Sequence, residues 1–233
     1  MVRMKVLVTG AAGYIASQIL PTFRDRYELV LVDVTDTDPE GSKVADVVVA
    51  DLIGRDRSRY AELFGGVDAV VHLGHHRRSG NPIDHFFDEN QNVEMAYNVF
   101  RSSYDSGVGR VVMASSNHAA DWYEHSLIHR RKMEVLDPYV LPLSDNFYGW
   151  AKATYEHMGF LFACGFPGFQ DPLGREHHTS GLDSGRRMGV VMVRIGAPRE
   201  LVLSNYEAAP ANYKRDLGAY ISPRDITQIF VKA

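Results

Sequence analysis

The segment at residues 6–16 reads Val-Leu-Val-Thr-Gly-Ala-Ala-Gly-Tyr-Ile-Ala, and it constrains the fold more than any other part of the chain. A branched apolar run ends in a glycine turn, and a helix-compatible stretch follows. Gly10 allows the tight turn, Gly13 lets ligand oxygens approach the backbone, and Ala16 allows the helix to pack closely on the strand. The unpaired N–H groups and the positive dipole end of that helix favour a diphosphate.

Short apolar runs alternate with longer helix-compatible stretches, which is typical of a parallel sheet with helices on both faces. Strands are expected at residues 5–9, 29–33, 47–50, 69–73, 110–114 and 189–195. Helices are expected at residues 14–26, 57–64, 84–106 and 144–164, with a last helix that begins near Pro223. A chain of 233 residues is long enough for one such core and short for two. We therefore predict a single, doubly wound α/β domain of the Rossmann type over residues 1–233.

Three stretches fit this alternation less well. Residues 121–143 mix charges, prolines and aromatics, so irregular structure is expected there. Residues 165–188 are rich in Gly, Arg and His without either period, which predicts an inserted surface loop or an oligomer contact. Residues 197–233 remain for a small C-terminal substrate-side region, and a truncated chain would explain this shortness. Pro21 predicts a kink or an early end of the first helix, because it lacks an N–H group.

Composition excludes several classes of function. The net charge of −4 leaves no basic stripe, so no nucleic-acid partner is expected. Cys164 is the single cysteine, which excludes an internal disulfide and fits a reducing compartment. No apolar run approaches the roughly 20 residues of a membrane span, and the chain runs from Met1 directly into a strand without a signal peptide. We expect a cytoplasmic protein without a membrane partner.

Asp33 indicates which ligand the glycine turn binds. It ends the second expected strand, about 20 residues after Gly13, where a carboxylate accepts hydrogen bonds from the adenosine ribose hydroxyls. The same charge would repel a 2′-phosphate, and no Arg follows directly, so NAD is favoured over NADP. Further cofactor contacts are expected around the turn and at the strand ends, from Ala12, Tyr14, Ile15, Asp51, Leu52, Leu73, Gly74, His75, Asn92 and Ile195.

Tyr148 and Lys152 form the pattern Tyr-x-x-x-Lys, which places both side chains on one face of a helix. A phenolate base at neutral pH needs the tyrosine pKa lowered by about 2–3, or about 3–4 kcal/mol. A nearby ammonium and a positive nicotinamide ring favour the anion. Ser116, just beyond the fifth expected strand, would orient the reacting oxygen. These three residues predict proton transfer from an alcohol coupled to hydride transfer to NAD.

With these motifs the chain resembles the extended short-chain dehydrogenase/reductase superfamily, also called the NAD-dependent epimerase/dehydratase family. The matching residues are Thr9-Gly10-Ala11-Ala12-Gly13, Asp33, Asp51-Leu52, His72-Leu73-Gly74, Asn92, Ser115-Ser116, Tyr148-x-x-x-Lys152 and Ser222-Pro223-Arg224-Asp225. The resemblance implies a Rossmann fold, bound NAD(P) and a Ser116, Tyr148 and Lys152 triad.

A narrower resemblance to the uronate dehydrogenases rests on the run Ser-Ser-Asn-His at residues 115–118, with Val-Arg-Ile-Gly at residues 193–196. Those enzymes oxidise C1 of a hexuronic acid to an aldarolactone with NAD. The resemblance implies substrate contacts from Asn117 and His118, and it leaves the carboxylate-binding cation open, with Lys214 and Arg215 in the expected region. Arg77, in the loop after the fourth expected strand, is a separate candidate for an anion contact. The chain departs from the family in a wide interval between Ser116 and Tyr148, in residues 165–188, and in Ala197, where a Ser is expected.

Several polar residues have two readings each. His125 and His129 either hold a metal or form a solvated pair, and with no third ligand nearby we expect no metal site. Asn92 either holds backbone or water near the triad or packs helix against strand. Arg194 either binds a carboxylate or is paired within the protein. The loop that contains His75 and Arg77 either reaches substrate or is solvated.

The sequence thus predicts an NAD-dependent oxidoreductase that acts on a sugar or sugar acid, with hexuronate as the favoured substrate. A nucleotide-sugar epimerase or dehydratase on the same scaffold is the enzyme alternative, and a non-catalytic NAD-binding protein is the alternative from another class. The long helices at residues 84–106 and 144–164 also predict a homodimer built on a four-helix contact.

Overall fold

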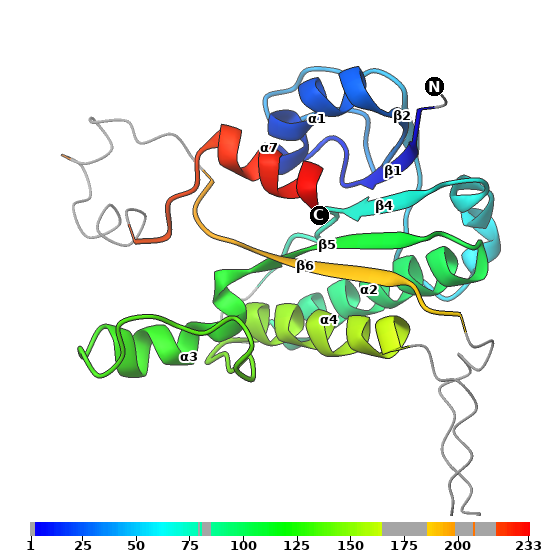
Figure 1. Cartoon of the computed structure of the whole chain (residues 1–233). Coiled ribbons are helices and arrows are strands. Elements are labelled where there is room, and N and C mark those ends of the chain that lie inside the picture. The colour runs from blue at the N-terminus through cyan, green and yellow to red at the C-terminus, as the bar shows by residue number, and fades with distance from the viewer. Residues whose placement is uncertain (1–2, 79, 81–84, 165–185, 199–206, 208–217) are drawn as a thin grey trace, which may run out of the picture.

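The computed structural model describes residues 3–78, 80, 85–164, 186–198, 207 and 218–233. The fold is a six-stranded parallel sheet between two layers of helices, as predicted (Figure 1). Its strands are β1 (Lys5–Thr9), β2 (Glu28–Asp33), β3 (Val47–Val49), β4 (Ala69–His72), β5 (Arg110–Ser116) and β6 (Gly189–Ile195). Its longer helices are α1 (Tyr14–Arg26), α2 (Phe86–Asp105), α4 (Phe147–Cys164) and α7 (Pro223–Lys232). None of the described helices is both long and apolar enough to cross a bilayer.

The strand order is β3-β2-β1-β4-β5-β6, so the order reverses between β1 and β4. Ligands of open α/β sheets bind at such a reversal, outside the carboxyl ends of the strands. In register, Thr9 at the end of β1 lies beside His72 at the end of β4. The fold therefore places the glycine turn after β1 and the loop after β4 on opposite sides of one crevice.

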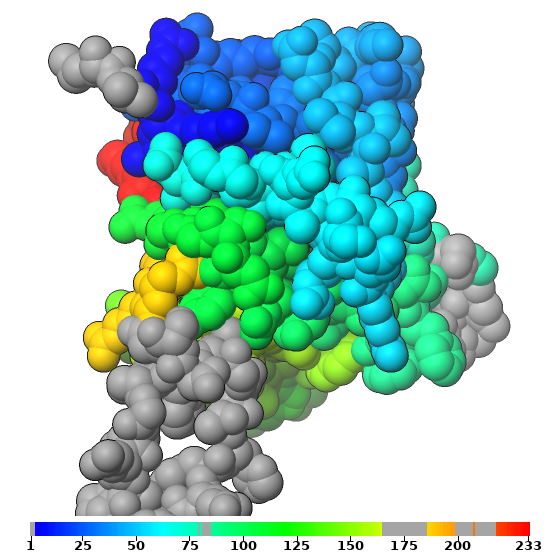
Figure 2. All heavy atoms as spheres, turned by 90° about the vertical axis from the view of Figure 1, so that its right-hand side faces the viewer, coloured from blue at the N-terminus to red at the C-terminus, as the bar shows by residue number. Residues whose placement is uncertain are grey.

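Alternate residues of each strand enter two separate cores, as the period of two requires. Leu7 packs with α2 and α4 on one face of the sheet, while Val6 and Val8 pack with α1 and α7 on the other. Figure 1 shows these two helix pairs on opposite sides of the strands. In Figure 2, which views the molecule from the side, the blue N-terminal segments lie above the sea-green and yellow-green segments of the α2 and α4 layer.

The prediction of a helix at residues 57–64 is wrong. Two 3-10 turns occupy it instead, η1 (Arg57–Arg59) and η2 (Ala61–Phe64). Tyr60 between them has φ −141° and ψ 0°, outside the helical region, and its ring is buried in the core. Burial of this ring between the turns outweighs continuous helical hydrogen bonding over so short a stretch.

Other element bounds differ by a few residues. The fifth strand extends beyond its expected end to Ser116, and the expected helix at residues 144–164 begins only at Phe147. The first helix continues past Pro21 to Arg26 without the early end considered above. Residues 121–143 contain the short helix α3 (Asp121–Tyr123) and the π-helical turn η4 (Glu124–Ile128) before the irregular structure that we expected. Residues 165–185 lie outside the part of the chain that the structure describes.

Candidate active site

The glycine turn after β1 fits a diphosphate. Gly10 has φ +68°, and a Cβ at this residue would lie 2.6 Å from the backbone nitrogen of Gly74, so only glycine allows the turns after β1 and β4 to touch. Gly13 is the N-cap of α1 and brings no side-chain cap, and the first turn of the helix contains no acidic residue. The N–H groups at this helix end are therefore not paired by a side-chain cap, and Tyr14 at its start is exposed.

Asp33 ends β2 beside this turn, as predicted. Its Oδ2 accepts a hydrogen bond from the Ala12 N–H at 2.9 Å, and its Oδ1 accepts one from the Val34 N–H at 2.7 Å. A carboxylate has about four acceptor positions, so acceptor capacity remains for ribose hydroxyls. Ala12, one of the predicted cofactor contacts, connects the glycine turn to Asp33 through its N–H.

The remaining predicted cofactor residues differ in what they contact. Asp51 Oδ1 accepts from the Ile53 N–H at 2.8 Å, while Leu52 is buried in the core. Asn92 binds the main chain of His76, accepting from its N–H at 2.6 Å and donating to its carbonyl at 3.1 Å. This arrangement supports the backbone-holding reading of Asn92. Leu73 and Gly74 follow β4, and Ile195 ends β6.

Ser116, Tyr148 and Lys152 lie together at the carboxyl end of β5. Ser116 ends the strand, and Tyr148 and Lys152 lie in the first turns of α4. The buried Lys152 Nζ donates to the carbonyl oxygen of Ala114 at 2.9 Å and lies 5.6 Å from the centroid of the Tyr148 ring. Both predicted catalytic side chains of α4 thus face the end of β5.

The protein's own charges do not lower the pKa of Tyr148 as predicted. Burial raises the pKa of Tyr148, with the hydrogen bond to Ser116 and the charge of Arg78 opposing it. Burial also lowers the pKa of Lys152 to about 8, and Glu89 partly opposes that change. Lys152 is therefore a weaker source of positive charge than an exposed lysine. Arg78 is a second cation at a similar distance from the phenol, since its guanidinium carbon lies 5.5 Å from the ring centroid.

A pocket of about 550 Å³ opens in front of the phenol. Its lining residues are His75, Arg77, Arg78, Ser116, His118, Tyr148, Gly196 and Pro198. Among the described residues that line it, two are arginines and none is acidic, so the pocket suits an anionic substrate. Arg78 is paired with the fully buried Glu89 at 2.9 Å, whereas the exposed Arg77 is the arginine available to substrate.

The structure brings together five of the predicted site residues in this pocket: His75, Arg77, Ser116, His118 and Tyr148. Asn117 follows Ser116 at the start of the 3-10 turn η3 (Asn117–Ala120). Lys214 and Arg215 lie outside the described residues. Arg194 is paired within the protein, because its guanidinium makes two hydrogen bonds to Glu156, at 2.8 and 2.7 Å.

Comparison with known proteins decides the family. Residues 6–163 match the model of the NAD dependent epimerase/dehydratase family. The chain belongs to the NAD-dependent epimerase/dehydratase family. The predicted Rossmann fold and NAD cofactor agree with that membership, and the fit of the glycine turn and Asp33 is the local evidence for NAD in this chain.

Within this family, the chain is similar to several sugar and sugar-acid dehydrogenases. The NAD-dependent glucose-6-phosphate dehydrogenase of Haloferax volcanii is 30% identical over 97% of this chain and 78% of its own length. The uronate dehydrogenase of Pseudomonas putida is 27% identical over 68% of this chain and 55% of its own length. A glucuronic acid dehydrogenase structure from Chromohalobacter salexigens has a TM-score of 0.61 at 27% identity, covering 85% of this chain and 64% of that one. The chain thus spans little more than half of the uronate dehydrogenase from Pseudomonas putida. The resemblance to uronate dehydrogenases is confirmed.

Sequence reasoning missed two residues that pack around the predicted catalytic residues. Glu89 is buried on α2 and pairs with Arg78, and Gly149 follows Tyr148 on α4. A Cβ on Gly149 would lie 2.8 Å from the carbonyl carbon of His118, and closer still to the carbonyl oxygen. Glycine at this position therefore allows α4 to touch η3. The available signal was a glycine directly after the tyrosine of the motif, within a helix where glycine is otherwise unfavourable.

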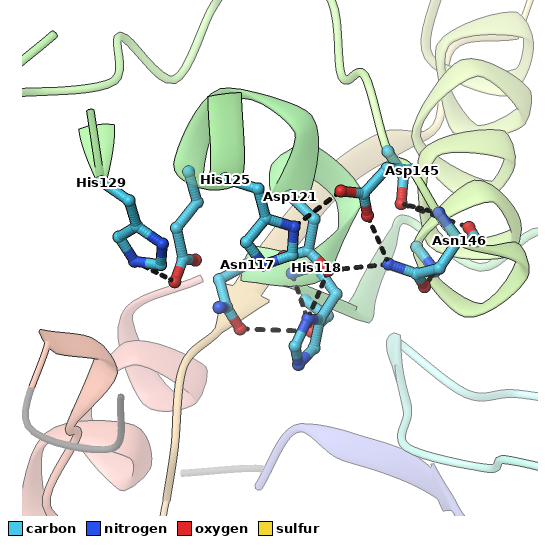
Figure 3. A network of polar contacts seen from close by, with 11 residues as sticks. Asn117, His118, Asp121, His125, His129, Asp145 and Asn146 are labelled. Carbon is cyan, nitrogen blue, oxygen red and sulfur yellow. Dashed lines mark hydrogen bonds and ion pairs between the residues drawn. The ribbon is translucent and has the colours of Figure 1, made fainter. Parts of the chain in front are cut away.

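A polar network lies beside the pocket (Figure 3). His118 Nδ1 is 2.7 Å from Asp121 Oδ2, and the Asn146 amide donates to the same oxygen at 2.8 Å. His125 and His129 each contact a carboxylate, Asp145 at 2.6 Å and Glu124 at 3.3 Å. Among the described residues no three or more His, Cys, Asp or Glu side chains gather as a metal site would require.

Proposed function

We propose that this protein is an NAD-dependent dehydrogenase that oxidises a hydroxyl group of a sugar or sugar acid. The observation that carries the proposal is the pocket in which Ser116 and Tyr148 lie beside two arginines, with no acidic side chain among the described lining residues. The relatives named above are dehydrogenases of a sugar phosphate and of uronates. Within this class we propose a hexuronate, oxidised at C1 to an aldarolactone, because its carboxylate offers the negative charge that Arg77 would bind.

The glycine turn, the start of α1 and Asp33 would hold the cofactor. NAD would supply the hydride acceptor for the oxidation of substrate C1, at which the C–O bond becomes a carbonyl. Tyr148 Oη takes the hydroxyl proton in the same reaction, so the substrate loses one hydride and one proton. Ser116 Oγ hydrogen-bonds the reacting oxygen and holds it close to the phenol. Arg78 favours the phenolate electrostatically, and Lys152 would bind the ribose next to the nicotinamide.

The test is a substrate panel with glucuronate, galacturonate, glucose 6-phosphate, glucose and arabinose, each with NAD and with NADP. The proposal predicts NADH formation with a uronate, and loss of that activity by about 10²-fold or more in Tyr148→Phe. The matched control is Tyr139→Phe, because Tyr139 is almost fully exposed and does not line the pocket. No NADH with any sugar in the panel refutes the dehydrogenase proposal. Activity restricted to glucose 6-phosphate refutes hexuronate alone.

A further inference from the structure

Asp121 is a buried carboxylate that connects the pocket to the helix bearing Tyr148. It begins α3 and is 2% exposed. One oxygen, Oδ2, pairs with His118 Nδ1 at 2.7 Å and accepts from the Asn146 amide at 2.8 Å. Figure 3 shows both contacts converging on this side chain. A carboxylate only accepts hydrogen bonds, so His118 Nδ1 carries the proton.

His118 lies between this carboxylate and the substrate pocket. Its ring lines the pocket and lies edge-on to the Tyr148 ring, with 5.5 Å between the centroids. Its backbone N–H donates to Ser116 Oγ at 3.2 Å. Since Nδ1 is occupied by Asp121, Nε2 is the ring nitrogen available to a ligand. A neutral ring with Nδ1–H presents Nε2 as an acceptor, which matches the donor that a sugar hydroxyl offers.

Asn146, which donates to Asp121, also hydrogen-bonds the start of α4. Its Oδ1 accepts from the Gly149 N–H at 2.9 Å, and its carbonyl accepts from the Trp150 N–H at 2.9 Å. These two bonds make Asn146 the N-cap of α4, and Tyr148 lies in the first turn of that helix. Asp121 thus binds both the residue that faces substrate and the cap that positions the phenol.

We propose that Asp121 is a positioning residue of the dehydrogenase site. It holds His118 as the Nδ1–H tautomer, so that Nε2 accepts a hydrogen bond from a substrate hydroxyl next to the reacting one. The inference rests on the proposed function for its kinetic consequence, but the tautomer itself is independent of any activity. His125 and Asp145 form a second imidazole–carboxylate pair of similar length, 2.6 Å, that does not line the pocket.

The first measurement is the imidazole nitrogen spectrum of the wild-type protein, with His118→Gln used to assign the signal. We expect the Nδ1–H tautomer for His118, and a shift towards Nε2–H in Asp121→Leu, which removes both acceptor oxygens. Asp121→Asn keeps one acceptor oxygen and should keep the Nδ1–H tautomer. A wild-type His118 found mainly as Nε2–H overturns the proposal, even where Asp121→Leu fails to fold.

The second measurement separates positioning from a purely structural role. Asp121→Leu should raise KM for the substrate about tenfold and change kcat less than about threefold, which corresponds to loss of one oriented hydrogen bond in ground and transition states. The same substitution in a His118→Gln background should add little to KM, because the residue through which Asp121 acts is gone. An undiminished KM rise in that background overturns the inference. Glu124→Leu is the matched control, because Glu124 pairs with His129 at 3.3 Å and does not line the pocket, and it should leave KM unchanged.

The two proposals fail in different ways. A wild-type protein that oxidises no sugar refutes the proposed function, while the His118 tautomer remains measurable. An active wild type whose KM and His118 signals are insensitive to Asp121→Leu refutes the inference and leaves the dehydrogenase proposal in place.

Discussion

Replacing Gly149 by alanine tests whether close contact between α4 and η3 is what places the phenol in the pocket. A Cβ there would lie 2.8 Å from the His118 carbonyl carbon, whereas carbon atoms in contact lie about 3.5–4.0 Å apart. The obstacle is backbone, which cannot rotate away like a side chain. The first turn of α4, with Tyr148, must therefore retreat from η3 by about 1 Å.

Two effects of opposite sign decide the stability of Gly149→Ala. Alanine favours a helix over glycine by about 1 kcal/mol, and overpacking costs about 1–3 kcal/mol, so we expect a net loss of about 1 kcal/mol. Activity is more sensitive, because misplacing a catalytic group by about 1 Å costs on the order of 10²-fold. Thermal unfolding measures the first effect, and kcat/KM with the active sugar measures the second.

Gly159→Ala is the matched control on the same helix. A Cβ there would approach Val190 Cγ1 at 2.9 Å and the flexible end of Met192, in the core and away from the pocket. It should change stability without lowering kcat/KM comparably. A Gly149→Ala protein with wild-type kcat/KM would refute the reasoning, because it would show that the position of the Tyr148 phenol does not depend on the close contact between α4 and η3.

Three further predictions follow from ionisation, pairing and exposure. Burial lowers the pKa of Lys152 from 10.5 to about 8, so the unfolded chain binds this proton more strongly than the folded protein does. The free energy of unfolding of wild type should therefore rise by up to ~3 kcal/mol relative to that of Lys152→Met as the pH increases from 8 to 10.5, measured by urea unfolding. A difference that does not change with pH would contradict this. Arg194→Met leaves the largely buried Glu156 without its cation, so it should destabilise the folded protein by ~2–4 kcal/mol in the same assay and leave KM unchanged. A raised KM would indicate that Arg194 contacts substrate. Phe87 on α2 and Phe160 on α4 are 73% and 69% exposed, which supports the predicted dimer. Sedimentation should show a dimer for wild type and a monomer for Phe87→Asp. A wild-type monomer at micromolar concentration would reject the dimer.

The part of the site nearest the glycine turn was predictable because its signals are local. Gly10 and Asp33 act through turn geometry and strand position, and both properties depend on neighbours in the sequence. Tyr148 and Lys152 share a helix, so their common face follows from a spacing of four. Ser116 followed from its place at the end of a strand.

The interactions that surround the triad were not predictable in the same way. Glu89 and Arg78 pair across the start of α2, and their role appears only when α2 lies against the phenol. The raised pKa of Tyr148 is likewise a result of burial, and burial depends on packing. The expected helix at residues 57–64 failed for the same reason, since burial of Tyr60 outweighed local propensity.

Sequence alone determined the doubly wound architecture and predicted the glycine turn and the grouping of Ser116, Tyr148 and Lys152, because each depends on short-range spacing or on the alternation of apolar runs. Tertiary structure alone decided that Arg78 joins Lys152 beside Tyr148, that Arg194 is paired with Glu156, and that Asp121 contacts His118. These are contacts between side chains far apart in sequence or dependent on a local turn, and only the packed layers bring them within hydrogen-bonding distance and out of water.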